Sequence, residues 1–316
     1  MTPVPFAKFE RDVLKLYMAP LRKKKTLLQV KQVLREFGSL PDVKTTEDLS
    51  PETIALWIAA HPDRSAVTIT SLLHGAGPLF NFAVFKGWLD RNPLEFRGPS
   101  QWVRPELRPV KRPHPESRSL GEIGRVLETA DAEARGGGWE ARRLRAMVYC
   151  YAYLGLRAGE ARHLWRSDVD LIARTVTVQA HPEDDWSPKT LRSAAVLPIA
   201  APLEPILRYW LRMAGEPWLF PGVRRVRPWG AGGGGGDALK QVKALGLRAG
   251  VPGLTIASLR KTVGTYAKTW GLSGLELKAL LRHSRIETQD WYDSKHVAAI
   301  RPAVERVTYP RLSQAG

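Results

Sequence analysis

Four side chains in this sequence are of the types that bind and attack a phosphodiester. Arg157 comes just after a glycine expected to end a helix, and its planar guanidinium can hold two phosphate oxygens at once. Glu160, three residues further along, could orient that guanidinium from one helical turn away. Near the C-terminus, Arg260, His283 and Tyr292 occupy three short segments with apolar residues between them.

Together these residue types suit cleavage of a phosphodiester by a tyrosine. Two arginines and a histidine would offset the charge that builds on a pentacoordinate phosphorus. A tyrosine phenol has a pKa of about 10, so nearby cations must favour the phenolate and another group must accept its proton. Each residue also has an ordinary reading: Arg157 as a surface arginine, His283 as a helix-end cap, Tyr292 as a half-buried aromatic. Their joint order favours the chemical reading.

Three stretches resemble the tyrosine recombinases, the phage-integrase family. The most specific runs from Gly155 to Asp168, GLRAGEARHLWRSD, and resembles that family's box TGLRxSEL…L.W.DID. Residues 281–286, LRHSRI, followed by Tyr292, resemble the pattern LGHSS…TT…Y. In the first half, residues 81–94, NFAVFKGWLDRNPL, resemble the end of the family's core-binding domain.

The resemblance implies a role for each residue. Tyr292 is the implied nucleophile, Arg157 and Arg260 the implied clamp on the scissile phosphate, and His283 its hydrogen-bond donor. Lys189, in a polar loop before an expected strand, is the implied general acid that protonates the leaving 5′-oxygen. The resemblance implies no metal ion, nucleotide or other cofactor, because the phosphotyrosine bond keeps the energy of the broken ester.

One position departs from the family pattern. The motif around the second arginine usually reads His-x-x-Arg, and this chain has Ala257 where the histidine should be. Lys261 or Ser258 is a conceivable substitute. Because the nucleophile, both arginines and the lysine are retained, the expected consequence is a lower turnover.

The charge of the chain points to a polyanionic partner. It has 48 Lys and Arg against 31 Asp and Glu, a formal net charge of +17. Phosphates attract such an excess and release counterions on binding, so double-stranded DNA is the expected partner. The candidate DNA-binding side chains lie in basic runs and beside the polar loop: Arg22, Lys23, Lys24, Lys25, Arg104, Arg108, Lys111, Arg112 and Arg192.

The sequence divides into two expected domains joined by a linker. Residues 1–103 have helical spacing of apolar residues and are expected to form a helical core-binding domain. Residues 104–118 are rich in proline and basic residues and are expected to be an extended linker. Residues 119–316 are expected to be the catalytic domain with its C-terminal tail. The whole is expected to be mainly α with a small β-sheet, and the resemblance implies that the two domains close as a C-shaped clamp around DNA.

Several local signals predict particular elements. Ser50 before Pro51 and Ser119 before Glu122 are predicted helix starts. Gly75, Gly77 and Pro78 are expected to break or kink any helix that spans them. Residues 175–178 and 195–198 are predicted strands. A glycine run at 232–236 is expected to be a surface loop, and the tail after Tyr292 could pack on its own domain or on a neighbouring protomer.

Other classes of protein are disfavoured. Cys150 is the single cysteine and lies in an apolar run, so a buried thiol in a reducing cytoplasm is expected. No apolar run of membrane-spanning length and no metal-ligand cluster are expected from the sequence.

The resemblance therefore implies a site-specific DNA recombinase in the cytoplasm, which would act as a homotetramer on two synapsed DNA sites and could be a monomer off DNA. Two alternatives stay open. One is a recombinase-like protein that binds DNA but no longer cuts it, which Ala257 motivates. The other is a DNA-relaxing enzyme similar to type IB topoisomerases, which would use the same phosphotyrosine chemistry.

Overall fold

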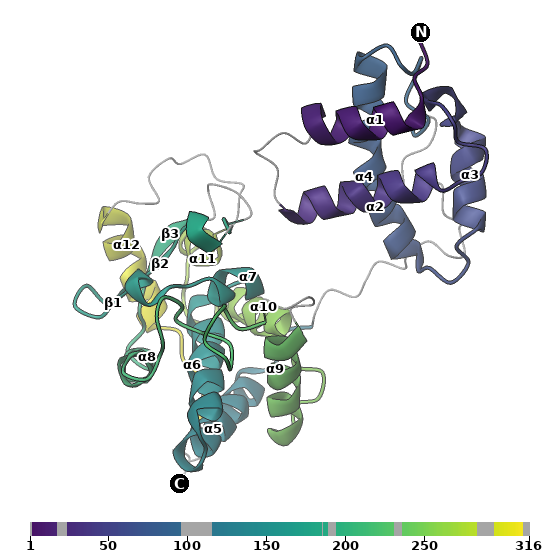
Figure 1. Ribbon diagram of the computed structural model, residues 1–316. Helices are drawn as coiled ribbons and strands as arrows, with labels where there is room; N and C mark the ends of the chain where they lie inside the picture. Colours follow the sequence, from purple (N-terminus) through teal and green to yellow (C-terminus); the bar gives the residue numbers. More distant parts are fainter. Residues whose placement is uncertain are drawn as a thin grey trace. The chain divides into compact units, whose positions relative to one another are not determined.

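The structure is a computed structural model that describes residues 2–17, 24–95, 116–184, 186–188, 194–230, 236–282 and 294–311. It separates into two compact units, residues 1–113 and 114–316 (Figure 1). The division falls within the segment expected to be a linker, of which the structure describes residues 116–118. Each unit has its own hydrophobic core.

The N-terminal unit is built of helices. They are α1 (Phe6–Asp12), a π-helical turn (Val13–Tyr17), α2 (Lys24–Gly38), α3 (Pro51–Ala59) and α4 (Ala66–Phe85). Ser50 caps α3 as predicted, because its hydroxyl accepts the backbone N–H of Thr53 at 3.2 Å. In the core, the ring of Phe37 stacks on Trp57 with centroids 5.3 Å apart.

Helix α4 corrects one expectation from the sequence. It continues for 20 residues through Gly75, Gly77 and Pro78, so of the break or kink predicted there the break does not occur. A side chain at position 75 would lie 3.1 Å from Gln29 of α2, so the small residue permits close packing of two helices. The Asn92 amide donates to the Gly77 carbonyl at 3.3 Å next to the proline, which satisfies one backbone group there.

The same helix has the length and apolar composition of a membrane span, contrary to the expectation that no such stretch exists. Seven of its side chains are nevertheless buried in the core of the N-terminal unit. Within that unit, α4 is a central helix against which α2 packs.

The C-terminal unit is mainly helical with a small sheet, which confirms the predicted fold class. Its helices are α5 (Leu120–Gly136), α6 (Trp139–Leu154), α7 (Ala158–Arg162), α8 (Glu204–Leu211), α9 (Gly236–Arg248), α10 (Ile256–Tyr266), α11 (Gly274–Leu281) and α12 (Ser294–Glu305). The strands β1 (Val169–Asp170), β2 (Thr175–Val178) and β3 (Ala195–Pro198) form an antiparallel sheet in that order.

Helix α6 is the centre of the C-terminal unit. Every side chain from Ala146 to Leu154 is buried, because α5, α8, α9 and α10 pack around this helix. Cys150 lies among these side chains as expected, and burial raises the pKa of its thiol. The helix ends at Gly155, whose φ of +54° is a left-handed conformation that glycine adopts readily. This abrupt end turns the chain toward Arg157.

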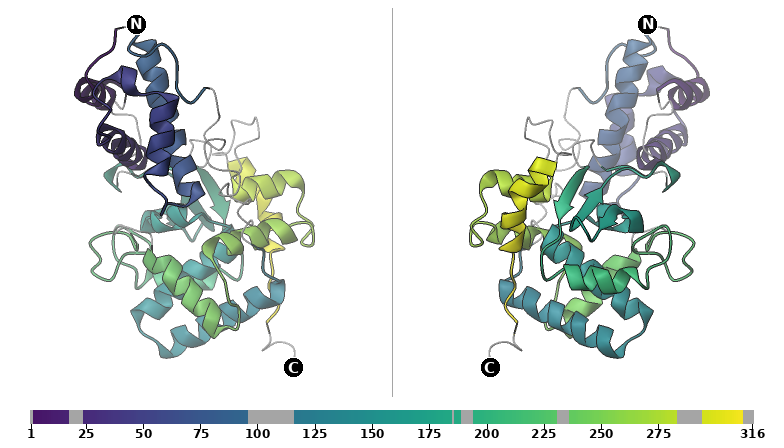
Figure 2. Two further views of the ribbon diagram at one scale, coloured as in Figure 1. Left: turned by 90° about the vertical axis from the view of Figure 1, so that its right-hand side faces the viewer. Right: turned by 90° about the vertical axis from the view of Figure 1, so that its left-hand side faces the viewer.

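The chain after α12 packs on its own unit. Helix α12 lies beside β3 (Figures 1 and 2). The buried Tyr309 donates its hydroxyl to the Ala152 carbonyl of α6 at 2.7 Å. Arg311 donates to Asp131 at 3.2 Å and to the Tyr149 hydroxyl at 2.6 Å. Of the two arrangements that the sequence left open, the described part of the tail adopts the one within the chain.

Candidate active site

Arg157 lies directly after the end of α6 and before α7. The carboxylate of Glu160 accepts the Arg157 guanidinium at 2.6 Å through one oxygen and the Arg157 backbone N–H at 2.8 Å through the other. Glu160 thus orients this arginine, as the spacing of three residues predicts. The side chain of Arg157 is 33% exposed, whereas that of Glu160 is 3% exposed. The arginine therefore faces solvent while its carboxylate partner is buried.

Arg260 reaches the same place from α10. Thr255 and Ser258 cap the start of that helix, and Arg260 lies in its second turn. Its guanidinium donates to the carbonyl of Gly155, at the end of α6, and to the carbonyl of Leu281, at the end of α11. The structure therefore brings together Arg157, Glu160 and Arg260, three residues that the sequence selected from segments about 100 residues apart.

A third arginine, Arg282, completes the group. It follows α11 and donates to Glu160 at 2.6 Å, to Leu280 at 2.7 Å and to Gly155 at 3.2 Å. Its own carbonyl accepts the Arg157 guanidinium at 3.2 Å. We call Arg157, Arg260, Arg282 and Glu160 the arginine cluster.

The geometry of the arginine cluster follows from two helix ends that meet. The last carbonyls of α6 and α11 have no partners within their helices, and they carry the partial negative charge of the helix C-terminus. Arg260 and Arg282 both donate to these carbonyls. The helix ends therefore stabilise the two cations, and Glu160 is the one carboxylate in the cluster. Three arginines and one glutamate leave the cluster with a formal charge of 3 − 1 = +2.

The electrostatics of the cluster show this surplus of positive charge. Burial and the positive charges of Arg282 and Arg157 together lower the pKa of Arg260 to about 9, although Glu160 opposes them. Burial opposes ionisation of Glu160, but Arg282 and Arg157 outweigh it and lower the pKa of that carboxyl. An anion in contact with Arg260 and Arg157 would relieve the repulsion between them. The cluster can therefore bind an anionic group such as a phosphate.

The other implied catalytic residues, Lys189, His283 and Tyr292, lie outside the described residues. So do Arg22, Lys23, Arg104, Arg108, Lys111, Arg112 and Arg192, whereas Lys24 and Lys25 begin α2. Arg282 precedes His283 in the sequence, so the described chain leads from the arginine cluster directly to the implied histidine.

The chain that leads to Lys189 is anchored beside α7. The ring of Trp186 stacks on His163, with centroids 4.9 Å apart and planes within 6°. Trp165 and Trp218 both donate their indole N–H to Asp184, at 3.0 and 2.6 Å. Burial lowers the pKa of His163, which favours the neutral ring that stacks here. These contacts fix the described part of the loop close to the helix that follows Arg157.

The structure removes one of the two substitutes considered for the missing histidine. The Ser258 hydroxyl accepts the backbone N–H of Thr255 at 2.8 Å and donates to the Thr255 carbonyl at 2.8 Å. It is buried and already used as part of the helix cap, so it is not free to serve the site. Ala257 and Lys261 are both exposed on α10.

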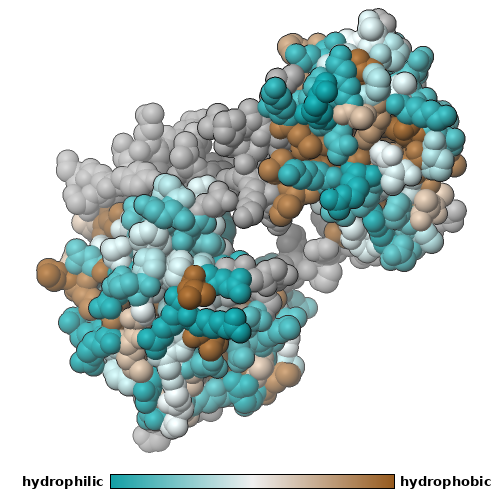
Figure 3. Space-filling view, in the orientation of Figure 1, coloured by the Kyte–Doolittle hydropathy of each residue, from teal (hydrophilic) through white to brown (hydrophobic). Residues whose placement is uncertain are grey.

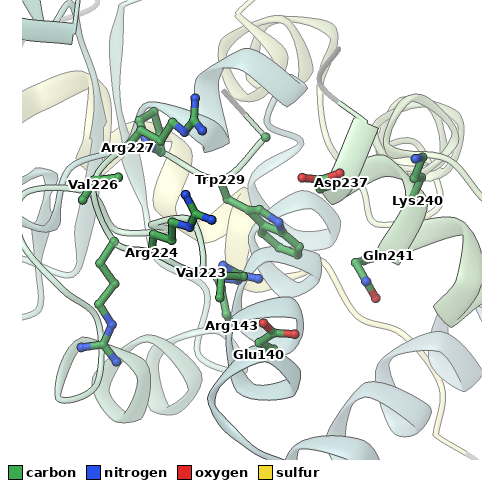
Figure 4. A pocket seen from close by; sticks show the side chains of 14 residues that line it. Glu140, Arg143, Val223, Arg224, Val226, Arg227, Trp229, Asp237, Lys240 and Gln241 are labelled. Carbon is green, nitrogen blue, oxygen red and sulfur yellow. The ribbon is translucent and has the colours of Figure 1, made fainter. Parts of the chain in front are cut away.

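A second basic feature of the C-terminal unit lies apart from the arginine cluster. A hollow of about 420 Å³ is bordered by α6, α9 and the chain between α8 and α9 (Figure 4). Arg224 and Arg227 line one side and Lys240 the other, with Trp229 between them. Beneath them Arg143 is buried, 3.8 Å from the centre of the Trp229 ring, and donates to the Pro221 carbonyl at 2.6 Å. We call this feature the basic hollow.

Exposed hydrophobic side chains are scattered on the C-terminal unit. Figure 3 shows small separate hydrophobic areas there, surrounded by hydrophilic surface. The exposed hydrophobic side chains of this unit include Ile172, Val223 and Val226, which lie on loops. Within the described ranges, no group of three His, Cys, Asp or Glu side chains is placed to hold a metal ion.

Comparison with known proteins places this fold. No model of a known protein family matches the sequence. No curated protein matches it either. Among solved structures, an integrase of the transposon Tn1549 in complex with a circular intermediate DNA superposes with a TM-score of 0.66. The identity is 15%, over 93% of this chain and 98% of that one.

Two structures of lambda integrase are also similar. A dimer bound to a COC' core site has a TM-score of 0.63 and 16% identity, over 92% of this chain and 98% of that one. A tetramer bound to a Holliday junction has a TM-score of 0.62 and 17% identity, over 90% and 80%. The chain therefore has the fold of the tyrosine recombinases and integrases, as the motifs around Arg157 and His283 predicted.

Sequence reasoning did not select Arg282. The sequence did contain a sign that Arg282 is unusual, since this arginine stands where the pattern LGHSS has glycine. The structure shows why glycine fits that position: the residue has φ +52°, a left-handed conformation. An arginine at a position suited to glycine indicates that its side chain has a use.

Proposed function

We propose that this protein is a site-specific DNA recombinase that cuts and rejoins DNA through a 3′-phosphotyrosine intermediate. The observation that carries the proposal is the arginine cluster, a site with surplus positive charge and a partly exposed guanidinium, located on the fold of the tyrosine recombinases. The net charge of +17 supports DNA as the partner. The similar integrases described above are bound to DNA, which also supports it.

In the proposed reaction, Arg157 and Arg260 hold the non-bridging oxygens of the scissile phosphate. The Tyr292 oxygen attacks phosphorus, a new P–O bond to tyrosine forms, and the bond from phosphorus to the 5′-oxygen breaks. A base takes the phenolic proton, and Lys189 gives a proton to the departing 5′-oxygen. His283 and the arginines stabilise the charge on the transition state. Attack by a 5′-hydroxyl on the phosphotyrosine reverses these steps and reseals the DNA.

The proposed assembly is a homotetramer on two DNA sites, which exchange strands in two steps through a Holliday junction. The lambda integrase tetramer bound to such a junction supports this arrangement. The N-terminal helical unit would contribute to DNA binding, and the protein would act on DNA in the cytoplasm.

The test uses duplexes with a nick beside the cleavage position, so that the cut piece diffuses away and the covalent complex accumulates. Because the target is undefined, the duplexes carry randomised flanks, and adducts that survive denaturation are selected and sequenced. Wild type should give an adduct that Tyr292→Phe abolishes. Failure of wild type and Ala257→His to form any adduct, on DNA that both bind, would refute the proposal.

Ala257 favours a second candidate function, a protein that binds DNA without cutting it. Its exposed position on α10 carries no group that can transfer a proton, and Ser258 is committed to the helix cap. An adduct from Ala257→His but none from wild type would support this function. Relaxation of a supercoiled plasmid that lacks any selected site would instead support an enzyme similar to type IB topoisomerases.

A further inference from the structure

Arg282 combines three features that are rarely found together in one arginine. It is the residue after α11 and has φ +52° and ψ +52°, a backbone conformation that side chains with a Cβ rarely adopt. Its side chain is 0% exposed, so its charge is buried. It joins two helix ends and a carboxylate, since it donates to Leu280, Gly155 and Glu160.

The backbone conformation and the buried charge of Arg282 both lower the stability of the fold, which indicates that this arginine is retained for a role. A left-handed arginine is less favourable than a left-handed glycine, and a buried charge is tolerated only when it is paired and hydrogen-bonded. Burial does lower the pKa of Arg282, and Glu160 counteracts this effect. The ion pair with Glu160, at 2.6 Å, is the contact that offsets burial most directly.

The contacts of Arg282 lead to both arginines of the proposed phosphate clamp, Arg157 and Arg260. Its guanidinium holds one oxygen of Glu160, and the other oxygen holds the guanidinium of Arg157. Its backbone carbonyl accepts a second donor of Arg157 at 3.2 Å. Arg260 donates to the Gly155 carbonyl, which Arg282 also contacts at 3.2 Å.

We propose that Arg282 is a positioning residue that sets the orientation of Arg157 and Arg260 toward the scissile phosphate. It does so by fixing Glu160 and the converging ends of α6 and α11, and it does not touch the phosphate itself. This inference rests on the proposed function and deepens it. It assigns to Arg282 a role that the glycine of the pattern LGHSS cannot perform.

A merely structural ion pair would have different consequences. It would stabilise the unit, and its loss would lower the melting temperature and the amount of active protein. It would not change how strongly the reaction depends on the negative charge of the phosphate. A positioning role does change that dependence, because misoriented arginines no longer offset the charge.

The experiment compares wild type with Arg282→Gly and Arg282→Lys on a nicked duplex that gives an adduct with wild type. The matched control is Arg174→Gly. Arg174 also has φ +52° and pairs with two carboxylates, Glu204 and Glu305, away from the arginine cluster. For each protein, three quantities are measured: the single-turnover rate of adduct formation, the Kd for DNA, and the melting temperature.

Arg282→Gly should slow adduct formation by about 10- to 100-fold, since small misplacement of catalytic groups costs up to about 100-fold. Its Kd should change less than about threefold, because many phosphate contacts determine the affinity. Arg282→Lys should recover part of the rate, because an ammonium can still pair with Glu160. Arg174→Gly should lower the melting temperature without slowing the reaction by more than about twofold.

The decisive measurement repeats the rate comparison on a substrate with a neutral methylphosphonate at the scissile position, because this group lacks the negative charge that the arginines offset. If Arg282 positions the clamp, the ratio of the wild-type rate to the Arg282→Gly rate should shrink toward one on this substrate. An equal ratio on both substrates, or rates of Arg282→Gly within twofold of wild type on the ordinary duplex, would overturn the inference. No adduct from wild type on DNA that it binds would instead overturn the proposed function itself.

Discussion

Glu160 contacts two guanidinium groups from opposite sides, that of Arg157 and that of Arg282. Its pKa is lowered in the folded protein: burial raises it, but Arg282, the backbone N–H of Arg157 and the Arg157 guanidinium lower it more. A carboxyl whose pKa falls on folding stabilises the protein above its unfolded pKa, here 4.5. That stabilisation is lost as the pH falls through the lower, folded value.

Glu160→Gln should therefore reduce the free energy of unfolding at pH 7, by about 3 kcal/mol, because two arginines lose their counter-ion. The difference from wild type should shrink as the pH falls below 4.5, because the unfolded wild-type chain takes up a proton there while folded Glu160, with its lowered pKa, does so only at lower pH. Urea unfolding at pH 7 and pH 3 measures this. The control Glu95→Gln changes an exposed carboxylate and should match wild type at both values. A constant difference at both pH values would contradict the assignment.

The sequence predicted part of the arginine cluster. The types and spacing of Arg157, Glu160 and Arg260 were enough to group them, because an arginine clamp needs a carboxylate to orient it. Arg282 was not predicted, since its importance depends on a left-handed backbone and on carbonyls from a distant helix. Such contacts arise only when α6 and α11 meet.

Among the elements, α5 is tied to the C-terminal tail by one close approach. A Cβ at Gly124 would lie 1.9 Å from the Pro310 carbonyl oxygen, too close for any side chain. A Cβ at Gly121, on the same helix, would meet no atom within 4 Å. The two glycines form a matched pair for testing how the tail docks.

Gly124→Ala should push the tail away from α5 and lower the free energy of unfolding by about 1–3 kcal/mol. Backbone amides of residues 307–311 should exchange with deuterium faster than in wild type. Gly121→Ala should be neutral or stabilising by up to about 1 kcal/mol, because alanine favours helix over glycine. If both variants behave alike, the tail does not pack on α5 in solution.

The loop between β2 and β3 depends on the stack of Trp186 on His163. Trp186→Ala should loosen this loop and slow adduct formation about tenfold through misplacement of Lys189, whereas Trp186→Phe keeps a ring and should lose less. DNA affinity should stay within about threefold of wild type. The account would be wrong about this anchor if Trp186→Ala cut DNA as fast as wild type.

Helices and strands were predicted correctly where the signal in the sequence spans only a few residues. Ser50, Ser119 and the two longer strands are as predicted, because capping and alternation act over a few residues. Helix α4 runs on through its glycines and proline because packing against α2 outweighs local propensity. Strand β1 was missed because it has two residues and depends on pairing with β2.

For the molecule as a whole, the net charge of +17 predicts DNA binding that weakens steeply with salt. The basic hollow offers Arg224 and Arg227 on an exposed loop. If each contacts a backbone phosphate, Arg224→Ala and Arg227→Ala should each reduce the slope of log K against log salt by about one. Arg248→Ala, whose arginine pairs with Glu133, should leave the slope unchanged. Unaltered slopes in all three would place DNA elsewhere on the molecule.

For the fold class, the mainly helical structure with a small sheet agrees with what the motifs indicated. The arrangement of protomers on DNA was not accessible from the sequence, because it depends on surfaces that form only after folding. The chemistry stays a prediction, because Lys189, His283 and Tyr292 lie outside the described residues.

The most direct test of the central claim identifies the atom that becomes bonded to DNA. The adduct from a nicked duplex is digested with nuclease and protease, and the modified peptide is sequenced by mass spectrometry. The account predicts a nucleotide attached to Tyr292 through its 3′-phosphate, and no adduct from Tyr292→Phe. A nucleotide on any other residue, or an adduct that persists in Tyr292→Phe, would contradict it.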